Sequence, residues 1–569
     1  MNNLKLIVEY INQKNLDKAL IHCDEHDKVS EQYIINNLKG VIYLLKNDQH
    51  LAEEYFIKSH NLNKTFEDPI NNLYLIYLKK KDFKRLLVSA KLLYEINILN
   101  EKYNYQLAYA FEVNNNNIQA IEFYNKCINL NGKNKIGAIN NIGNIFLRNN
   151  KNKTALNFFL QAESIKKNDK IIINNLFLNY IKLKDEKKAD EYYLKANNID
   201  NQSIEFLYNK AEYLILKGNY ENAIIILEAN KNINKFLIIL ISLYFNMGKS
   251  KEAEQLLKEN KDKIKSDPNL YNYLGIRSLY EGNFEDGWKY YEYRGSKLNS
   301  RFSAEKEWNG EKLDNKSIVV FSEQGLGDSI QFSKYLIPLA KLCNNVNFVV
   351  KNNIYKLFKN DYQNITIETF ETIKDKKYDY KISLGSLIKF FYKEEFKSEN
   401  DLIAQNKLEI SEWSEKFNRS KPNVGLVWSG SFYGPNQPFR SIPLKKLEKI
   451  FTLDIEFYCL QNEIWERDKI HFNEMKISDF GKYNLVEISS IIENLDLVIS
   501  ADTSILHLSA ALNKETWGIF NIYPDWRWGA LDKINPYKSL IKINQNKFNE
   551  WNDVADEIFK KLKNKFKLD

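Results

Sequence analysis

Small residues recur through the first half of the chain at an interval of about 34 residues. An aromatic or aliphatic residue often follows four positions later, and another small residue often comes twelve positions before. A small side chain lets the two helices of a hairpin approach closely, and a large one fills the gap to the next hairpin, so the pattern predicts stacked helical hairpins. The small residues are Ala19, Ala52, Ala120, Ala155, Ala189, Ala223, Ala253 and Gly287; the large ones are Phe56, Tyr124, Phe159, Tyr193, Leu227 and Tyr291; the preceding small ones are Gly40, Ala108, Gly143, Ala211 and Gly275.

The segments NNIGNIFLRNNKNKTALNFFLQA and YNYLGIRSLYEGNFEDGWKYYEYR carry this pattern and resemble the tetratricopeptide repeat (TPR), a helix–turn–helix unit. The resemblance implies a solenoid of about nine repeats over residues 1–295. The pattern departs in two places, because Leu86 replaces the alanine and the interval before Ala253 shortens to 30 residues. We expect the repeats at these two places to be distorted.

A carboxamide recurs two positions before the first small residue of several repeats. In a TPR this position lies on the first helix and faces the concave groove, where a carboxamide can donate to and accept from the amide of an extended peptide. The series resembles the asparagine ladder in the TPR half of the protein O-GlcNAc transferases, which implies a peptide-binding groove. Asparagine is abundant throughout the chain, so the alternative is that these are ordinary surface residues. The series is Asn72, Gln106, Asn141, Asn175 and Asn209.

The length and composition predict a globular protein of about two or three domains. The 569 residues are 44% hydrophobic and 27% charged, with a net charge of +8. No compact Lys/Arg block with interleaved aromatics is present, so we expect no nucleic-acid binding. The absence of CxxC or Cys/His clusters argues against a zinc site and a disulfide framework and fits a reducing cytoplasm. We recognise neither a signal peptide nor a run of about 18 apolar residues, so we expect a cytoplasmic protein with no transmembrane segment.

The second half alternates short β-branched or aromatic runs with helical stretches, which is typical of βαβ units with parallel sheets. The runs are SIVVF, VNFVV, YDYKISL, NVGLVWSG, IEFYCLQ, LDLVISA and ETWGIFN. The sequence therefore predicts an α + α/β chain. Its expected parts are a TPR superhelix over 1–295, a linker over 296–314, two Rossmann-like halves over 315–405 and 421–545, and a C-terminal bracing helix over 546–569.

Three loops that follow predicted strands hold candidates for a ligand site, because ligands of parallel sheets bind at the carboxyl ends of the strands. In the first loop Gly327 permits close backbone approach, and Asp328 is either a helix cap or a general base. In the second, Ser429 opens a loop that holds Arg440, which is either suited to a phosphate or an ordinary surface arginine. Gln461 ends the strand before the third loop, and taken alone it indicates little.

A fourth loop lies in DLVISADTSILHLSAAL, residues 496–512, and has the pattern of an anion site. A predicted strand leads through Asp502, Thr503 and Ser504 into a helix, whose first amides and dipole favour an anion. Helix capping alone would explain these three residues. It does not explain His507, one of six histidines, near the first turn on the same side as Ser504.

The order GLGD, VGLVWSG, Arg440-Ser, LQ and DLVISADTSILHLSAAL, followed by YPDWRWG, resembles bacterial TPR proteins with a glycosyltransferase domain of the ADP-heptose heptosyltransferase type. The segment EWNGEKL fits the same family. The resemblance implies a GT-B architecture, in which two Rossmann-like halves face a cleft. The diphosphate of a nucleotide sugar would bind to Thr503 and Ser504, with Arg440 and His507 neutralising it, and Asp328 would deprotonate the acceptor hydroxyl. The resemblance implies neither a metal ion nor another cofactor.

Two departures from the related families change what we expect. The first Rossmann-like half is short beside a free-standing heptosyltransferase, so we expect the repeats to supply part of the acceptor wall. The histidine and lysine motif pattern of the O-GlcNAc transferases is missing, so no GlcNAc donor is assigned. The amphipathic last segment is expected to cross back and brace the first half.

The resulting hypothesis is a metal-independent, inverting glycosyltransferase that modifies a Ser/Thr hydroxyl of a protein held in the TPR groove. Related proteins imply a bacterial surface or appendage protein as the acceptor. One alternative is a glycan or lipid-linked sugar as acceptor, with the repeats used only for docking. The other is an inactive GT-B/TPR scaffold, against which stands the presence of Asp328, Arg440 and His507 together.

Overall fold

The computed structural model describes residues 3–26, 28–149, 151–294, 302, 304–359, 362–373, 376–396, 400–405, 407–431, 439–534 and 537–568. Residues 296–301 and 303 of the expected linker, and residues 432–438 of the loop that leads to Arg440, therefore lie outside the described residues. The chain divides into two compact units, Met1–Tyr213 and Leu214–Asp569.

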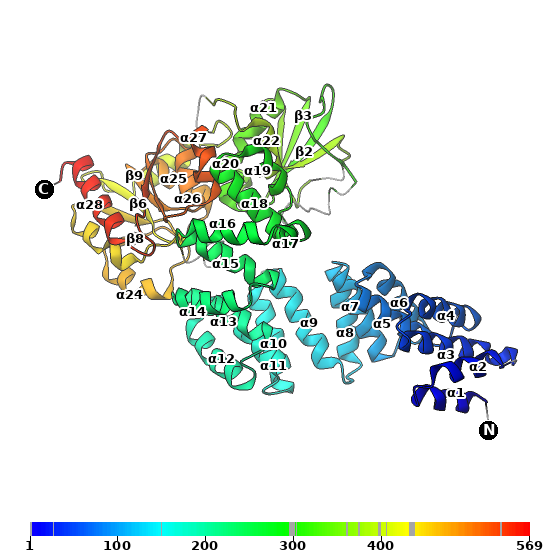
Figure 1. Ribbon diagram of the computed structural model, residues 1–569. Coiled ribbons are helices and arrows are strands. Elements are labelled where there is room, and N and C mark those ends of the chain that lie inside the picture. The colour runs from blue at the N-terminus through cyan, green and yellow to red at the C-terminus, as the bar shows by residue number, and fades with distance from the viewer. Residues whose placement is uncertain are drawn as a thin grey trace. The chain divides into compact units, whose positions relative to one another are not determined.

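The first unit is built of successive helix pairs, which follow one another in chain order in Figure 1. A methyl group on Gly40 would lie 2.5 Å from the ring of Phe56, and one on Gly143 would lie 2.6 Å from the ring of Phe159. The predicted contact between small and large residues is therefore what sets the spacing of these helices. The helices are α1 (Asn3–Asn12), α2 (Leu16–Asp24), α3 (Gln32–Leu45), α4 (Gln49–Leu62), α5 (Asp68–Lys80), α6 (Phe83–Ile96), α7 (Glu101–Val113), α8 (Asn117–Asn129), α9 (Lys135–Arg148), α10 (Asn152–Ile165), α11 (Lys170–Leu183), α12 (Glu186–Ile199) and α13 (Ile204–Leu216), with a short helix η1 (Val29–Glu31) before α3.

In four of the helix pairs the turn between the two helices is encoded locally. A residue in the left-handed region follows or ends the first helix, and the very next residue caps the second helix with a side-chain oxygen. The left-handed residues are Asn47, Lys81, Asn115 and Lys184, and the caps are Asp48, Asp82, Asn116 and Asp185.

The two irregular repeats behave differently from each other. Leu86 is fully buried in α6, which has 14 residues, as α4 does. Its larger side chain therefore takes the alanine position inside a helix of ordinary length. Where the interval shortens, α14 (Tyr220–Ala229) and α16 (Ser250–Glu259) have only 10 residues each.

The last helices of the repeat region belong to the second unit and pack against its α/β part. The ring centroids of Trp288 and Tyr291 lie 5.7 Å and 5.1 Å from that of Trp526. A methyl group on Gly529 would lie 2.5 Å from the carbonyl oxygen of Tyr280, so only glycine fits there. These helices are α14, α15 (Asn234–Asn246), α16, α17 (Lys261–Ser266), α18 (Pro268–Glu281) and α19 (Phe284–Tyr291).

The α/β part contains two all-parallel sheets, consistent with the expected GT-B architecture. The first has the order β1-β5-β2-β3-β4 and the second the order β11-β10-β9-β6-β7-β8. In the first sheet β3 and β4 follow on one side of β2, and the chain then returns to the other side with β5. In the second sheet β7 and β8 follow on one side of β6, and the chain returns to the other side with β9. The strand order therefore reverses between β2 and β5 and between β6 and β9. The strands are β1 (Lys306–Glu307), β2 (Ser317–Phe321), β3 (Asn345–Val350), β4 (Ile365–Thr369), β5 (Tyr380–Ser383), β6 (Asn423–Val427), β7 (Glu456–Cys459), β8 (Ile477–Asp479), β9 (Leu497–Ala501), β10 (Thr516–Phe520) and β11 (Leu540–Asn544).

All seven strands predicted from the sequence are present, and β1, β4, β8 and β11 were missed. The missed strands are short or lie at sheet edges, where exposed positions interrupt the apolar run. β1 lies inside the expected linker: Trp308 donates its backbone N–H to the carbonyl of Lys381 at 2.9 Å and so extends the contact with β5. The second half of the expected linker is thus an edge of the first sheet.

Helices cover the sheets between these strands. In the first half they are α20 (Leu326–Phe332), η4 (Ser333–Tyr335), α21 (Leu336–Ala340), η5 (Asn352–Leu357) and α22 (Leu384–Phe391), followed by α23 (Lys407–Ser414). In the second half they are η6 (Leu444–Thr452), α24 (Glu466–Glu474), α25 (Leu485–Glu493), α26 (Ser504–Ala511), η7 (Trp526–Trp528), α27 (Ala530–Ile534) and α28 (Asn552–Phe566). Within the described part of the chain, none of the helices combines the length and the apolar character needed to cross a membrane.

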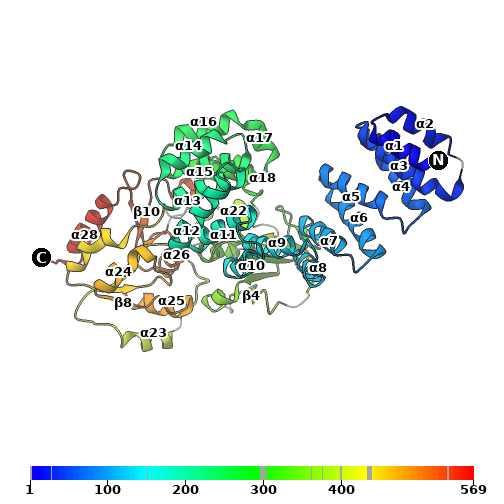
Figure 2. The same ribbon diagram turned by 90° about the horizontal axis from the view of Figure 1, so that it is seen from below.

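The prediction that the last helix braces the first half is wrong. Ile558 and Leu562 of α28 are fully buried and share a core with Leu447 and Ile450 of η6, in the second half. Both views show α28 in red beside the second sheet (Figure 1 and Figure 2). The apolar face of α28 finds its partner there because η6 presents a matching apolar face to it.

Candidate active site

The order of the second sheet reverses between β6 and β9, and their carboxyl ends mark the place where such sheets bind ligands. Ser429 follows β6, and Asp502 follows β9 and leads into α26. Thr503 is the N-cap residue of α26, but its side chain makes no capping hydrogen bond to any described residue, and its hydroxyl lies 3.2 Å from that of Ser500. The first amides of α26 are thus left without a side-chain cap, as an anion site requires.

The helix α20 of the first half packs directly against α26. A methyl group on Gly327 would lie 2.7 Å from Cδ2 of His507 and 3.4 Å from Cα of Ser504. The glycine therefore allows the close approach of the two helices. Three residues that the sequence singled out in two separate loops, Gly327 in the first half and Ser504 and His507 in the second, meet at this contact.

His507 is buried and neutral. It is 5% exposed, stacks on Trp528 at 5.2 Å between ring centroids, and its Nδ1 lies 3.5 Å from the hydroxyl of Tyr537. Burial, helped by the positive charge of Arg527, lowers the pKa of His507 to about 3. The imidazole is therefore uncharged near neutral pH, so it could serve a diphosphate as a hydrogen-bonding group and not as the cation that we expected.

The carboxyl of Asp502 lies 3.8 Å from Nε2 of His507. Burial raises the pKa of Asp502 to about 6, and Arg440 opposes this rise. Arg440 is thus close enough to act on Asp502, and its Nε is buried without a hydrogen-bond partner among the described residues. A guanidinium N–H with no partner beside the start of a helix suits an anionic oxygen.

Gln461 holds the loop after β6 in place. Its Oε1 accepts hydrogen bonds from the backbone N–H groups of Trp428 at 2.9 Å and Ser429 at 3.1 Å. Its Nε2 donates to the hydroxyl of Ser429 at 3.1 Å. The buried amide of Gln461 is therefore used up in positioning Ser429.

Asp328, the expected base, has both carboxylate oxygens engaged. Oδ2 accepts the backbone N–H of Gly325 at 2.8 Å, which caps α20, and Oδ1 forms an ion pair with Arg527. Arg527 also pairs with Asp525 and donates to Oε1 of Gln324 at 2.7 Å. Burial opposes the charged form of Arg527, but the carboxylates of Asp328 and Asp525 outweigh it and raise the pKa of Arg527 well above its usual value. Sequence reasoning missed Arg527, whose signal was its place in YPDWRWG after β10.

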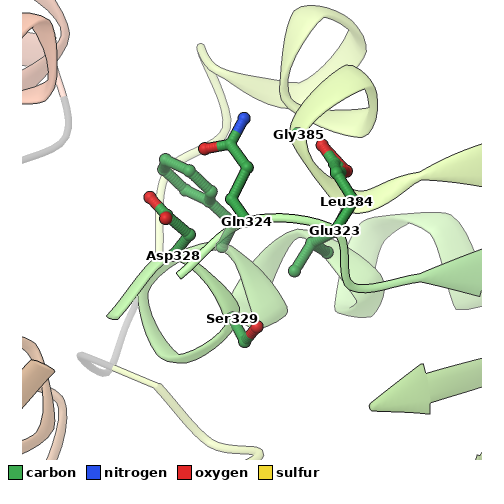
Figure 3. A pocket seen from close by; sticks show the side chains of 7 residues that line it. Glu323, Gln324, Asp328, Ser329, Leu384 and Gly385 are labelled. Carbon is green, nitrogen blue, oxygen red and sulfur yellow. The ribbon is translucent and has the colours of Figure 1, made fainter. Parts of the chain in front are cut away.

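A small pocket lies beside Asp328, where the order of the first sheet reverses. Residues of the segment after β2 line one side, and Leu384 and Gly385 after β5 line the other (Figure 3). Sequence reasoning also missed Glu323, which lines this pocket and whose only signal was its place in SEQGLGD.

The ladder residues lie in the first unit, and four of them donate to the repeat that precedes their own. These amide nitrogens bond at 2.8–3.3 Å to a side chain 35 or 36 residues earlier, so they link successive repeats. The pairs are Asn72 with Asn37, Asn141 with Tyr105, Asn175 with Asn140, and Asn209 with Asn174. Gln106 is buried, and its Oε1 has no hydrogen-bond partner among the described residues. Peptide binding by this series stays a prediction.

Comparisons with known families agree with this layout. The glycosyltransferase family 9 (heptosyltransferase) model matches residues 432–562, and a tetratricopeptide repeat model matches residues 101–134 and 178–203. The first match runs from η6 into α28 and includes α26 and Arg527. The second covers the α7–α8 pair, the end of α11 and all of α12.

Among characterised proteins, the chain is similar to Protein FlbA of Caulobacter vibrioides, at 21% identity over 41% of this chain. It is also similar to anaphase-promoting complex subunit 3 of Schizosaccharomyces pombe, at 32% identity over 16% of this chain. The matches span 44% and 14% of these two relatives, so the chain covers less than half the length of either.

Among solved structures, the chain is similar to pilF of Pseudomonas aeruginosa, at 15% identity with a TM-score of 0.30, over 37% of this chain and 96% of that one. It is also similar to the Cut9–Hcn1 assembly of APC/C, at 17% identity with a TM-score of 0.33, over 42% of this chain and 48% of that one. Likeness at these TM-scores carries no functional argument. From the family matches, the chain combines TPR repeats with a C-terminal region of the glycosyltransferase family 9 (heptosyltransferase) type.

Proposed function

We propose that this chain transfers a sugar from a nucleotide-sugar donor to a hydroxyl of a protein acceptor, without a metal ion. The observation that carries the proposal is the Nε of Arg440, which has no hydrogen-bond partner among the described residues, close to the start of α26, which has no side-chain cap among them, where a doubly wound sheet reverses. A diphosphate would lie on the first amides of α26 with the hydroxyls of Thr503 and Ser504. As the bond from the anomeric carbon to the diphosphate breaks, the helix dipole and Arg440 stabilise the growing negative charge.

A carboxylate on the first half would take the proton of the acceptor hydroxyl as its oxygen bonds to the anomeric carbon. The resemblance to heptosyltransferases implies Asp328 for this role and a single displacement with inversion. In support, Asp328 lies on α20, which packs against α26. The diphosphate would also offer Arg527 an anionic partner besides Asp328 and Asp525, which would weaken the ion pair that now engages Asp328.

A protein acceptor is supported by the TPR repeats, which are protein-binding modules. One observation favours a second candidate function, a glycosyltransferase with a glycan or lipid-linked acceptor whose repeats only dock a partner. The amide nitrogens of Asn72, Asn141 and Asn175 are already bonded to the preceding repeat. Asn141 donates to the hydroxyls of both Tyr105 and Tyr124, and Asn72 and Asn175 each use one of their two N–H groups, so fewer donors are left to bind a peptide backbone.

The test is direct binding of nucleotide sugars to the full chain. Titration calorimetry with ADP-, UDP-, GDP- and CMP-linked sugars, each with and without EDTA, should give binding with one nucleotide class that EDTA leaves unchanged. Arg440→Gln should weaken this binding at least tenfold, because a charge-assisted hydrogen bond contributes about 1.5–3 kcal/mol.

Arg419→Gln is the matched control. Arg419 lies just before the second half and donates to Asn494 at the end of α25, by the amino-terminal end of β6. Its substitution should leave the dissociation constant within about twofold. Absence of binding with all four classes, or equal weakening by both substitutions, would contradict the proposed donor site.

A further inference from the structure

We propose that Glu323 is the residue that takes the proton of the acceptor, in the pocket at the carboxyl end of the first sheet. This rests on the proposed function and refines it, because it moves the role of base from Asp328 to Glu323. Asp328 would then hold Arg527 in place. The ligand of the pocket is a neutral hydroxyl group, supplied by the acceptor or by a water molecule.

The geometry of Glu323 leaves one carboxylate oxygen without a partner. Its side chain is 3% exposed, and Oε1 accepts two hydrogen bonds from Arg294, from Nε at 3.1 Å and from Nη2 at 2.8 Å. Oε2 is buried and accepts no hydrogen bond from any described residue. A buried carboxylate oxygen left unpaired is unfavourable, so this oxygen is suited to a donor that the protein itself does not supply.

Asp328 lines the same pocket but has no such free oxygen (Figure 3). One of its oxygens caps α20 through Gly325, and the other is paired with Arg527. A guanidinium holds each of the two carboxylates and favours its charged form, but the contacts of Asp328 engage both of its oxygens, whereas Arg294 engages only Oε1 of Glu323. Of the two carboxylates in the pocket, Glu323 is therefore better prepared to receive a proton.

The environment of Glu323 supports the same role. Burial raises the pKa of Glu323, and the neighbouring charge of Asp328 adds to the rise, whereas Arg294 and the amide of Gly385 oppose it. A general base works best when its pKa lies near the working pH. The surroundings thus shift Glu323 in the direction that a base requires.

Two further contacts hold Glu323 in position. Arg294, which follows α19 at the end of the repeat helices, also donates to the hydroxyls of Ser383 at 2.7 Å and Ser386 at 2.8 Å. A methyl group on Gly385 would lie 2.6 Å from Oε1 of Glu323, so glycine makes room for the ion pair. The last repeat helices are therefore tied to the proposed base through one buried guanidinium.

The proposed step balances as follows in atoms and charge. The acceptor oxygen forms a bond to the anomeric carbon, and the bond between that carbon and the diphosphate oxygen breaks, with its electron pair leaving on the diphosphate. The proton of the acceptor hydroxyl passes to Oε2 of Glu323. When water takes the place of the acceptor, the same step releases the free sugar and the nucleotide.

Slow hydrolysis of the bound donor by water tests the proposal without knowledge of the acceptor. The full chain is saturated with the nucleotide sugar that binds it, and release of free nucleotide is followed together with the donor dissociation constant. Glu323→Gln should slow the release at least 100-fold, in line with the contribution of a general base, and leave the donor constant within about twofold. Compared with Glu323→Gln, Asp328→Asn should slow the release of nucleotide less. It should change the dissociation constant of the donor more, because it frees Arg527.

Two further variants separate a chemical role from a structural one. Glu323→Asp keeps the charge opposite Arg294 and should restore at least tenfold of the rate lost in Glu323→Gln, even if the latter is poorly folded. Glu368→Gln is the matched control, because Glu368 is a part-buried, ion-paired carboxylate on β4 of the same sheet, outside the pocket. Its release rate should equal that of the unaltered chain.

Four outcomes would overturn the proposal. Nucleotide release at the unaltered rate by Glu323→Gln, or loss of release in Asp328→Asn alone, would remove Glu323 as the base and leave the proposed function standing. A chain that binds the donor but releases no nucleotide over a day would also count against a base beside a water site. A chain that binds no nucleotide sugar would overturn the proposed function, and this proposal with it.

Discussion

Burial decides the charge of the residues around α26 more than their identity does. From the sequence, a histidine at the start of a helix and beside a polar turn suggests a positively charged side chain that would bind an anion. Packing against Trp528 and against the Gly327 turn of α20 removes water from His507 and makes the neutral imidazole the stable form. The positive charge at this site therefore belongs to Arg440 and Arg527.

His507→Gln should make the second unit less sensitive to acid. In the unfolded chain His507 binds a proton below about pH 6.5, whereas in the folded chain it stays neutral down to about pH 3. Unfolding therefore takes up a proton in this window, and stability falls as the pH falls. Between pH 7 and pH 5 the unaltered chain should lose about 2 kcal/mol more of its free energy of unfolding than His507→Gln does.

Urea unfolding followed by tryptophan fluorescence measures this difference, because all nine tryptophans lie between residues 288 and 551. The other charged neighbours, Asp502, Asp525, Arg440 and Arg527, are present in both proteins, so their own titration cancels in the comparison. Equal loss of stability in the two proteins would mean that His507 is protonated in the folded chain.

At the scale of single elements, the repeat hairpins depend on contacts between side chains that are close in the sequence. Gly40 and Gly143 each meet a ring from the second helix of their own pair, and four of the turns combine a left-handed residue with a cap directly after it. Such contacts repeat with the period of the sequence, which explains why the repeats could be predicted. α28 could not be predicted in this way, because its apolar face fits more than one distant surface.

Two substitutions of the same kind in α9 test the hairpin contact. Gly143→Ala would place a methyl group 2.6 Å from the buried ring of Phe159, and should destabilise the first unit by about 1–3 kcal/mol. Gly137→Ala would place one 3.3 Å from the ring of Tyr105, which is only partly buried, and should be neutral or stabilising by up to about 1 kcal/mol, since alanine favours a helix.

Thermal unfolding followed by far-UV circular dichroism reports these changes. The tryptophan fluorescence transition should stay where it is in both variants, because the first unit contains no tryptophan. An equal effect of the two substitutions would show that the contact with Phe159 does not limit the approach of α9 and α10.

At the scale of the whole molecule, the division at Tyr213 and Leu214 separates a unit of repeats from a unit in which repeats and sheets share contacts. Three residues of one segment connect the two kinds of structure within the second unit. Trp526 contacts α19 and Gly529 contacts α18, whereas Trp528 stacks on His507. The segment YPDWRWG thus joins the end of the repeat helices to the candidate site.

The two units should unfold in separate steps. In urea, the loss of helix followed by far-UV circular dichroism should show two transitions, whereas tryptophan fluorescence should show only the one that belongs to residues 214–569. The physical reason is that cooperativity needs dense shared contacts, and each unit has its own hydrophobic cores. Coincident transitions by both probes would indicate a single cooperative molecule.

The sequence by itself determined the repeats, the seven main strands, the parallel sheets and the loops that carry Asp328, Arg440 and the start of α26. These depend on spacing along the chain and on the rule that ligands bind at strand ends. Only the tertiary structure decided the neutral state of His507, the pairing of Asp328 with Arg527 and the free oxygen of Glu323. Those properties depend on burial and on partners that are far away in the sequence, and neither can be read from local pattern because each is set by the packing of separate elements.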